Sequence, residues 1–115
     1  MPYESKIRHH NADRVTKNTT VSRSLLEQIK EIANHKQVPF NQLLTEGIDY
    51  VLDTYKKPKE FKPPVKPKDR IKMGTTFSNS QYEQLKDRAR RLHTHANTLL
   101  IEIGMEFIIK KYQNG

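Results

Sequence analysis

The chain contains one stretch of sequence twice, and this internal repeat constrains its fold more than any other feature. Residues 13–33 read DRVTKNTTVSRSLLEQIKEIA and residues 69–89 read DRIKMGTTFSNSQYEQLKDRA, so a shift of 56 positions aligns them. A fixed internal period defines the size of the structural unit. We therefore predict a basic arm at 1–12, a first unit at 13–55, a linker at 56–68, a second unit at 69–112 and a tail at 113–115.

The second unit is longer than the first by one residue. Toward the end of each unit the alignment improves when the shift is 57, which places Gly47 over Gly104. One extra residue is therefore expected in the turn of the second unit, between Arg90 and Thr98. A shift of 56 still aligns Asn41 with Asn97, so the sequence leaves its site open.

Within each unit the hydrophobic period changes from two to about 3.6 residues. The alternation predicts strands near 14–21 and 70–77, each with one buried and one polar face. Lys17 falls on the first buried face, where we expect its stem to pack and its amine to reach solvent. The buried faces are expected to comprise Val15, Lys17, Thr19 and Val21, and Ile71, Met73, Thr75 and Phe77.

Two helices are predicted after each strand. Ser22 or Ser24 is a candidate N-cap of the first helix, and Ser24 with Glu27, like Ser80 with Glu83, fits a capping box. The second helix is expected to start near Asn41 or Thr98. The glycine within it costs helix stability, which predicts a close approach to another helix.

Composition limits what these units can be. A unit of about 43 residues is close to the lower limit for independent folding, and the chain has no cysteine to form disulfides. Association of the copies is therefore expected. No stretch reaches the roughly 18 apolar residues of a membrane span, and the first residues lack the apolar core of a leader peptide. A cytoplasmic, nucleoid-associated location without membrane contact is the expectation.

The charge of the chain favours a nucleic-acid partner. Twenty-one Lys and Arg against thirteen Asp and Glu give a net charge of +8, which is typical of nucleic-acid binders. The linker holds six lysines and one glutamate, so it carries most of this charge, and its four prolines favour an extended chain. We interpret it as a spacer, with a proline-rich peptide ligand as the less favoured alternative.

The order of elements resembles the ribbon-helix-helix family of bacterial, plasmid and phage DNA-binding proteins, to which the Arc and MetJ repressors belong. The resemblance covers residues 14–55 and 70–112, and it includes TTVS and TTFS where each strand meets its helix, and LLTEG and LIEIG in the second helix. It implies an α+β, mainly α fold of two tandem β-α-α repeats, which form an intrachain pseudo-dimer with a two-stranded antiparallel ribbon. Pairing of strands between chains is left open.

The resemblance also implies which residues contact DNA bases. In this family the outward residues of the ribbon read bases in the major groove. Arg or Lys can donate to guanine, Asn can pair with adenine, and Thr offers a hydroxyl and a methyl group. Gly74 is either silent or a point of close backbone approach. A merely solvated strand is the less favoured alternative. The implied base-contacting residues are Arg14, Thr16, Asn18, Thr20, Arg70, Lys72, Gly74 and Thr76.

The family further places the start of the second helix against the DNA backbone, where free N–H groups attract phosphate. Simple helix capping is the alternative for each side chain. The implied phosphate-contacting residues are Phe40, Asn41, Gln42, Asn97 and Thr98.

Other residues that could carry chemistry are interpreted as surface groups. The pairs His9, His10 and His93, His95 lack the companion ligands of a metal site, so no metal is expected. The run Arg88, Arg90 and Arg91 is predicted to be a solvated face, with flanking DNA or a protein as alternatives. The chain has no phosphate-binding loop or nucleophile motif, so no enzyme activity, cofactor or small-molecule substrate is expected.

These expectations combine into a sequence-specific binder of double-stranded DNA, most simply a repressor that occludes a promoter. The alternative is an accessory factor of a mobile element, such as a relaxosome or plasmid partition protein, which recruits other proteins to DNA. Self-association on tandem sites is left open. Because the two strands differ in their outward residues, we expect an asymmetric binding site, with Asn18 and Lys72 acting in opposite halves.

Overall fold

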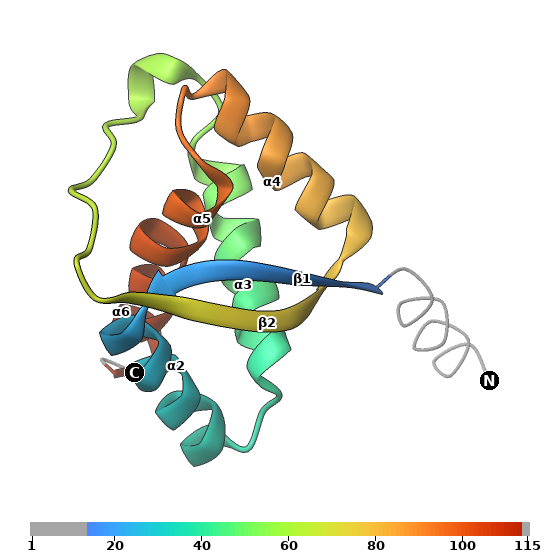
Figure 1. Ribbon diagram of the computed structural model, residues 1–115, viewed down its shortest axis with the longest axis vertical. Coiled ribbons are helices and arrows are strands. Elements are labelled where there is room, and N and C mark those ends of the chain that lie inside the picture. The colour runs from blue at the N-terminus through green and yellow to red at the C-terminus, as the bar shows by residue number, and fades with distance from the viewer. Residues whose placement is uncertain (1–13, 114–115) are drawn as a thin grey trace.

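Two strands from opposite halves of the chain form an antiparallel sheet on one side of the molecule. The computed structural model describes residues 14–113, in which β1 (Arg14–Ser22) pairs with β2 (Arg70–Ser78). We call these two paired strands the ribbon. Asn18 lies opposite Gly74 at the middle of the register. Figure 1 shows both strands crossing in front of the helices, and the predicted N-terminal arm lies outside the described residues.

A helix follows each strand directly, because a serine at the strand end caps the helix. The hydroxyl oxygens of Ser22 and Ser78 each accept a hydrogen bond from the backbone N–H three residues later, at 3.4 and 3.5 Å. These serines are the N-caps of α2 (Arg23–Lys36) and α4 (Asn79–Arg91). Ser24 and Ser80, which the predicted capping boxes use as N-caps, are therefore not the N-caps of these helices.

Beyond these helices the two halves of the chain differ. The first half continues with one unbroken helix, whereas the second half continues with three consecutive segments. The first half ends with α3 (Phe40–Thr54), and a 3₁₀ turn (Pro58–Glu60) lies in the linker. The second half ends with α5 (Ala96–Thr98), a π-helical segment (Leu99–Met105) and α6 (Glu106–Gln113).

The π-helical segment accounts for the extra residue of the second half. Gln37 and His93, which are 56 positions apart, share the same left-handed backbone, with φ of 57°. Gly47 and Gly104, which are 57 positions apart, face each other. Asn41 and Asn97, also 56 positions apart, make equivalent contacts with Thr76 and Thr20. The extra residue therefore falls between Asn97 and Gly104, where i→i+5 hydrogen bonds enclose one more residue per turn. The predicted position in the turn between Arg90 and Thr98 is corrected accordingly.

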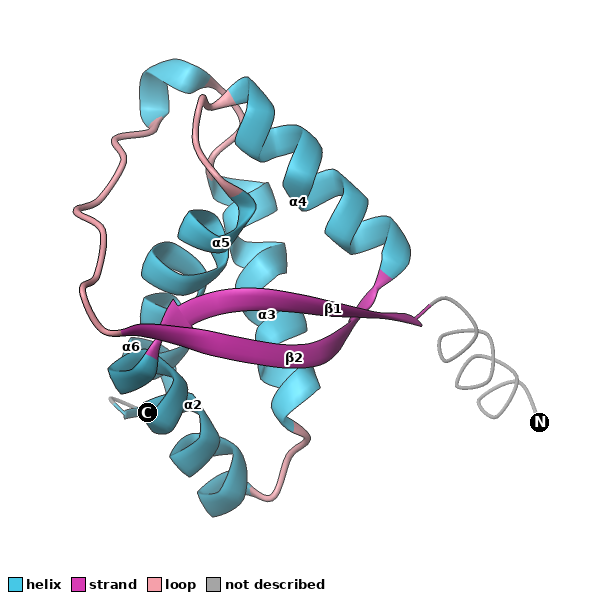
Figure 2. Ribbon diagram, viewed as in Figure 1, coloured by secondary structure: helices cyan, strands magenta, loops and turns pink. Residues whose placement is uncertain are grey.

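The prediction of two tandem β-α-α repeats forming a pseudo-dimer is wrong. The chain forms one small α+β domain, in which a single two-stranded antiparallel sheet lies against helices (Figure 2). The mainly α content agrees with the prediction. The repeat description fails because the inserted residue breaks the last helical region into segments, and because both halves contribute to one core.

The core lies between the ribbon and the helices. Val21, Met73 and Phe77 point inward from the strands and are 0, 6 and 2% exposed, which confirms the predicted buried parity. Lys17 is half-buried, and its Nζ lies 5.6 Å from the centroid of the Tyr82 ring, as expected for a packed stem with an escaping amine. Helix residues from both halves complete the core, among them Ile29, Leu43, Ile48, Leu85, Leu99, Ile101, Met105 and Ile108.

The predicted close approach at the helix glycines is confirmed. A Cβ atom built on Gly47 would lie 2.9 Å from the carbonyl oxygen of Gly104, and one on Gly104 would lie 3.2 Å from the carbonyl oxygen of Gly47. One turn further on, Tyr50 and Phe107 stack with ring centroids 3.9 Å apart. α3 and the π-helical segment therefore cross in backbone contact.

The linker is held to the domain at its first half. Phe61 is 7% exposed and meets the Tyr55 ring edge-on, with centroids 5.7 Å apart. Arg88, predicted to be part of a solvated face, instead donates hydrogen bonds of 2.8 Å to the carbonyl oxygens of Leu52 and Tyr55 at the end of α3. Val65, in the second half of the linker, is 91% exposed. Among residues 14–113, no helix combines the length and apolar composition needed to cross a bilayer.

Asp69, the first residue after the linker, accepts hydrogen bonds from the start of α2. Its Oδ2 accepts hydrogen bonds from the backbone N–H of Ser24 at 3.0 Å and from the Ser22 hydroxyl at 3.2 Å. The backbone N–H of Ser24 is the main cause that lowers the pKa of Asp69 below its ordinary value, and the Ser22 hydroxyl adds to it. The charged form of Asp69 therefore stabilises the folded state.

Asp69→Ala is expected to lower the Tm at neutral pH and to have less effect as the pH falls. Because the pKa of Asp69 is lowered by folding, its contribution is present above the ordinary pKa of an aspartate and is lost as the pH falls through the folded value. Thermal unfolding of both proteins between pH 7 and pH 2 measures this. Asp53→Ala is the control, because Asp53 is exposed and its Oδ1 lies 3.9 Å from Lys56 Nζ in a surface ion pair. A Tm difference that does not depend on pH would contradict the assignment.

Candidate nucleic-acid interface

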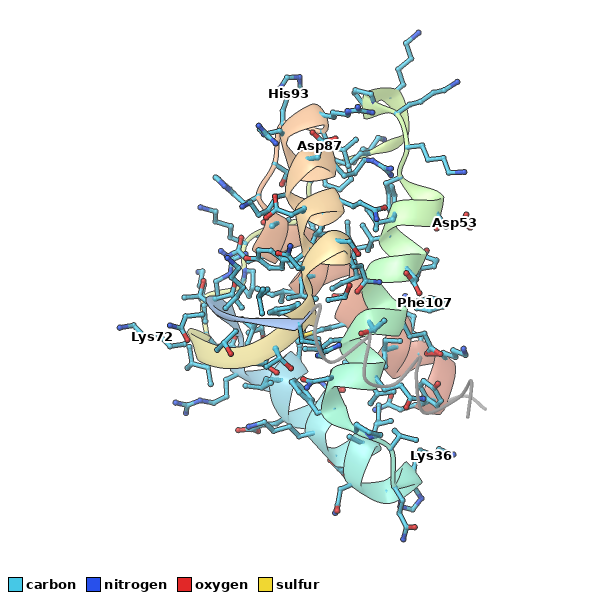
Figure 3. The ribbon with its side chains drawn as sticks, turned by 90° about the vertical axis from the view of Figure 1, so that its right-hand side faces the viewer. Lys36, Asp53, Lys72, Asp87, His93 and Phe107 are labelled. Carbon is cyan, nitrogen blue, oxygen red and sulfur yellow. The ribbon has the colours of Figure 1, made fainter. Side chains whose placement is uncertain are left out.

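The outward face of the ribbon is polar and exposed. Thr16, Asn18 and Thr20 on β1, and Lys72 and Gly74 on β2, are exposed, whereas the alternate residues point toward the helices. In Figure 3 the ribbon forms one edge of the molecule and the labelled Lys72 extends away from the helices. The predicted division of each strand into an inner and an outer face is therefore confirmed.

At the middle of this face, Gly74 makes room for Asn18. A Cβ atom on Gly74 would lie 2.8 Å from Asn18 Oδ1, so a larger residue would displace that side chain. Asn18 is therefore at the centre of the ribbon, and Lys72 lies opposite Thr20, toward one end. The predicted placement of Asn18 and Lys72 in opposite halves is corrected, since Asn18 occupies the middle.

One end of the ribbon carries a hydrogen-bonded network. Arg14 donates from Nε to Thr76 Oγ1 at 3.1 Å and from Nη2 to the carbonyl oxygen of Thr76 at 2.7 Å. Asn41, at the start of α3, donates to Thr76 Oγ1 at 2.9 Å and accepts from the Thr75 hydroxyl at 2.6 Å. The Thr76 hydroxyl thus accepts two hydrogen bonds, and its O–H donates to no group among residues 14–113, so it can donate to another acceptor.

The other end of the ribbon is built differently. Arg70, the sequence equivalent of Arg14, turns toward the helices and forms an ion pair with Glu102, with Arg70 Nη2 at 3.1 Å from Glu102 Oε1. Its side chain is 18% exposed. Asn97 donates to Thr20 Oγ1 at 3.1 Å, which matches the contact of Asn41 with Thr76. Arg70 is the predicted base-contacting residue that does not join the outward face.

The helix starts predicted to contact phosphate lie beside the ribbon. α3 begins at Phe40 after Pro39, and α5 begins at Ala96, and neither start has a side-chain cap hydrogen bond. Asn41 and Asn97 bond to the strands, so capping does not explain them. Gln42 is exposed, Phe40 is half-buried, and Thr98 is 4% exposed and faces the core. Thr98 is therefore poorly placed for a phosphate contact.

Arg90 and Arg91, in the last turn of α4, form exposed ion pairs with Asp87. Arg90 Nη2 lies 3.6 Å from Asp87 Oδ1, and Arg91 Nε lies 3.3 Å from Asp87 Oδ2. Exposed pairs of this kind contribute little to stability. His93 and His95 are exposed, and the described residues hold no cluster of three or more metal-ligating side chains. His9 and His10 lie outside the described residues.

Residue patterns alone did not identify the roles of Asn41, Asn97 and Glu102. Asn41 follows β1 in the sequence but contacts Thr76 on β2, whereas Asn97 follows β2 but contacts Thr20 on β1. Only the tertiary fold therefore brings each asparagine to its strand. The signal for Glu102 was the change of the alignment shift from 56 to 57 ahead of it, because an inserted residue alters which side chains of the last helical region face the ribbon. Comparisons with protein-family models, with curated proteins and with solved structures found no match. The family resemblance therefore stays a prediction.

Proposed function

We propose that this domain binds double-stranded DNA by placing the outward face of the ribbon in the major groove. The observation that carries the proposal is the row of exposed polar side chains, Thr16, Asn18, Thr20 and Lys72, along a two-stranded ribbon at one edge of the molecule. A two-stranded ribbon fits the width of the major groove. The net charge of +8 supports the same partner.

The side chains of this face suit the edges of bases. Asn18 can pair bidentately with adenine, and Lys72 can donate to guanine O6 and N7. The Thr76 hydroxyl, whose acceptor positions are occupied by Arg14 and Asn41, is set to donate to an acceptor such as thymine O4 or a phosphate oxygen. The start of α3, with exposed Gln42 and no side-chain cap hydrogen bond among the described residues, supports contact with the DNA backbone.

Binding to duplex DNA is expected to weaken steeply with salt and to depend on sequence. Selection from a random duplex pool, followed by titration of the selected and a scrambled duplex over a range of salt concentrations, tests this. Each neutralised phosphate should contribute about 0.9 to the slope of log K against log salt. Equal affinity for the selected duplex, the scrambled duplex and heparin would contradict the proposal.

Changing Lys59, Lys62 and Lys66 together to Gln is expected to flatten the salt slope and leave base preference unchanged. These lysines are exposed on the linker, and each that neutralises a phosphate adds about 0.9 to the slope. The measurement is the same titration, with Lys110→Gln, at an exposed position on α6, as control. An unchanged slope in the triple variant would show that the linker lies away from the DNA.

A further inference from the structure

Two arginines at equivalent sequence positions have different partners in the fold. Arg14 and Arg70 are 56 positions apart, and each begins a strand of the ribbon. Arg14 bonds across the ribbon to Thr76 and stays on the sheet. Arg70 bonds to Glu102 in the π-helical segment behind the sheet. The two ends of the ribbon therefore present different groups to solvent.

The pair of Arg70 and Glu102 is buried but incompletely satisfied. The Glu102 side chain is 5% exposed, and only one of its oxygens, Oε1, bonds to Arg70. Within the described residues, Glu102 Oε2 and Arg70 Nε are buried without a hydrogen-bond partner. Burial raises the pKa of Glu102, and Arg70 opposes this effect. Buried pairs with unsatisfied atoms add little net stability compared with apolar side chains, so the pair is poorly explained as a stabilising device.

The inserted residue explains why an acid faces Arg70 at one end only. Each residue in a helix turns the following side chains by about 100°, so the insertion in the π-helical segment changes which residues face the ribbon. In the first half, Glu46 is the acid at the position 56 residues before Glu102, and it bonds instead to Lys111 at 3.1 Å and Tyr112 at 2.9 Å. Among residues 14–113, the hydrogen bonds of the Arg14 side chain go to Thr76 and not to a carboxylate.

We infer that Glu102 is a specificity-determining residue, which holds Arg70 against the helices and removes one of the two strand arginines from contact with DNA bases. The inference rests on the proposed DNA-binding function. Base preference at this end of the ribbon then comes from Lys72 and Thr20, the exposed pair that lies two residues closer to the centre of the ribbon than Arg70. Glu102 acts through Arg70 and is itself a positioning residue.

Releasing Arg70 should create a new base preference. Glu102→Gln removes the charge that holds Arg70, so its guanidinium can turn outward and donate to guanine O6 and N7. We expect a gain of roughly 5- to 150-fold in preference for guanine at one additional position, which is the range of a good bidentate contact. The position should lie beyond that read by Lys72, since Arg70 is two residues nearer the ribbon end.

The matched controls remove the arginine. Arg70→Gln, and the double variant Arg70→Met with Glu102→Leu, should keep every base preference of the wild-type protein within about twofold. The apolar double variant is chosen because such replacements of buried pairs commonly preserve the fold. Binding of all four proteins to a library of single-base variants of the selected duplex gives the comparison.

The outcomes separate the inference from the function on which it rests. Wild-type protein without any base preference contradicts the proposed function. Wild-type preference that disappears at one position in Arg70→Gln shows that Arg70 reads DNA and overturns the inference alone. Unchanged preference in folded Glu102→Gln also overturns it. If Glu102→Gln does not fold, Arg70→Gln and the double variant decide: retained preference in both supports the inference, and loss at one position in both overturns it.

Discussion

Gly47→Val is expected to lower the free energy of unfolding by about 3 kcal/mol or more, near the upper end of the range for overpacked cores. The added Cβ would lie 2.9 Å from the Gly104 carbonyl oxygen and 3.1 Å from its carbon, and both are backbone atoms that no rotamer change can move. α3 and the π-helical segment would have to separate, which would also pull apart the stacked rings of Tyr50 and Phe107. A domain of this size is marginally stable, so the Tm should fall by more than about 10 °C.

Gly74→Ala is the matched control for this prediction. A Cβ on Gly74 meets only the end of the Asn18 side chain, which can rotate away, and the position is exposed. Thermal and denaturant unfolding should therefore place Gly74→Ala within about 0.5 kcal/mol of the wild-type protein, as for most surface substitutions. Equal destabilisation by the two variants would show that the Gly47 contact is not specific. The double variant Gly47→Ala with Gly104→Ala should cost less than the sum of its single variants, because both act on one contact.

The elements that depend on local sequence were predictable. Alternation of apolar and polar residues identified the inner face of the ribbon at Val21, Met73 and Phe77, since a strand has a strict period of two. The glycine within the second helix predicted a close helix contact, because a helix seldom retains glycine without a packing reason. Each of these inferences uses one residue pattern and one rule of geometry.

The interruption of the last helical region was not predictable from the repeat. The inserted residue was expected in the turn before the helix, where an extra residue is tolerated more easily than within a helix. The structure places it in the π-helical segment instead, after the left-handed turn residue His93 and before Gly104. Where an insertion is absorbed depends on the packing of both sides, and Gly104 is fixed by its contact with Gly47.

The partners of polar side chains were also beyond the sequence pattern. Arg14 and Arg70 are indistinguishable in the alignment, yet one bonds to Thr76 and the other to Glu102. Glu102 is 32 positions from Arg70, and whether it faces the ribbon depends on the register of the π-helical segment. Long-range polar contacts of this kind follow from the tertiary fold and not from spacing along the chain.

The differences between the two ends of the ribbon determine what kind of DNA site fits the proposal. From one end to the other, the outward pairs are Thr16 with Thr76, Asn18 with Gly74, and Thr20 with Lys72. Identical strands would repeat each residue on both sides of the centre and would demand a palindrome. Here the centre carries one asparagine and one flank carries the lysine, so an asymmetric site is expected.

Asn18→Ala and Lys72→Ala are each expected to weaken binding by about 1–3 kcal/mol at a single base position, which is roughly 5- to 150-fold. Each side chain is exposed and can make a bidentate contact with one base. Because Lys72 lies opposite Thr20, two residues along the strand from Asn18, the two side chains are separated by about 7 Å along the ribbon. The affected positions should therefore lie about two base pairs apart, with that of Asn18 nearer the centre of the site.

Binding of the wild-type protein and both variants to all single-base changes of the selected duplex measures these positions. Lys30→Ala, at an exposed position on α2, is the matched control and should change no base preference. Gly74→Ala should reproduce the base effect of Asn18→Ala, because its Cβ would displace the Asn18 side chain by steric contact at 2.8 Å while the fold remains stable. Relaxed preference at the same position in Asn18→Ala and Lys72→Ala, or a uniform loss across all sequences, would show that the outward face of the ribbon does not read bases in this order.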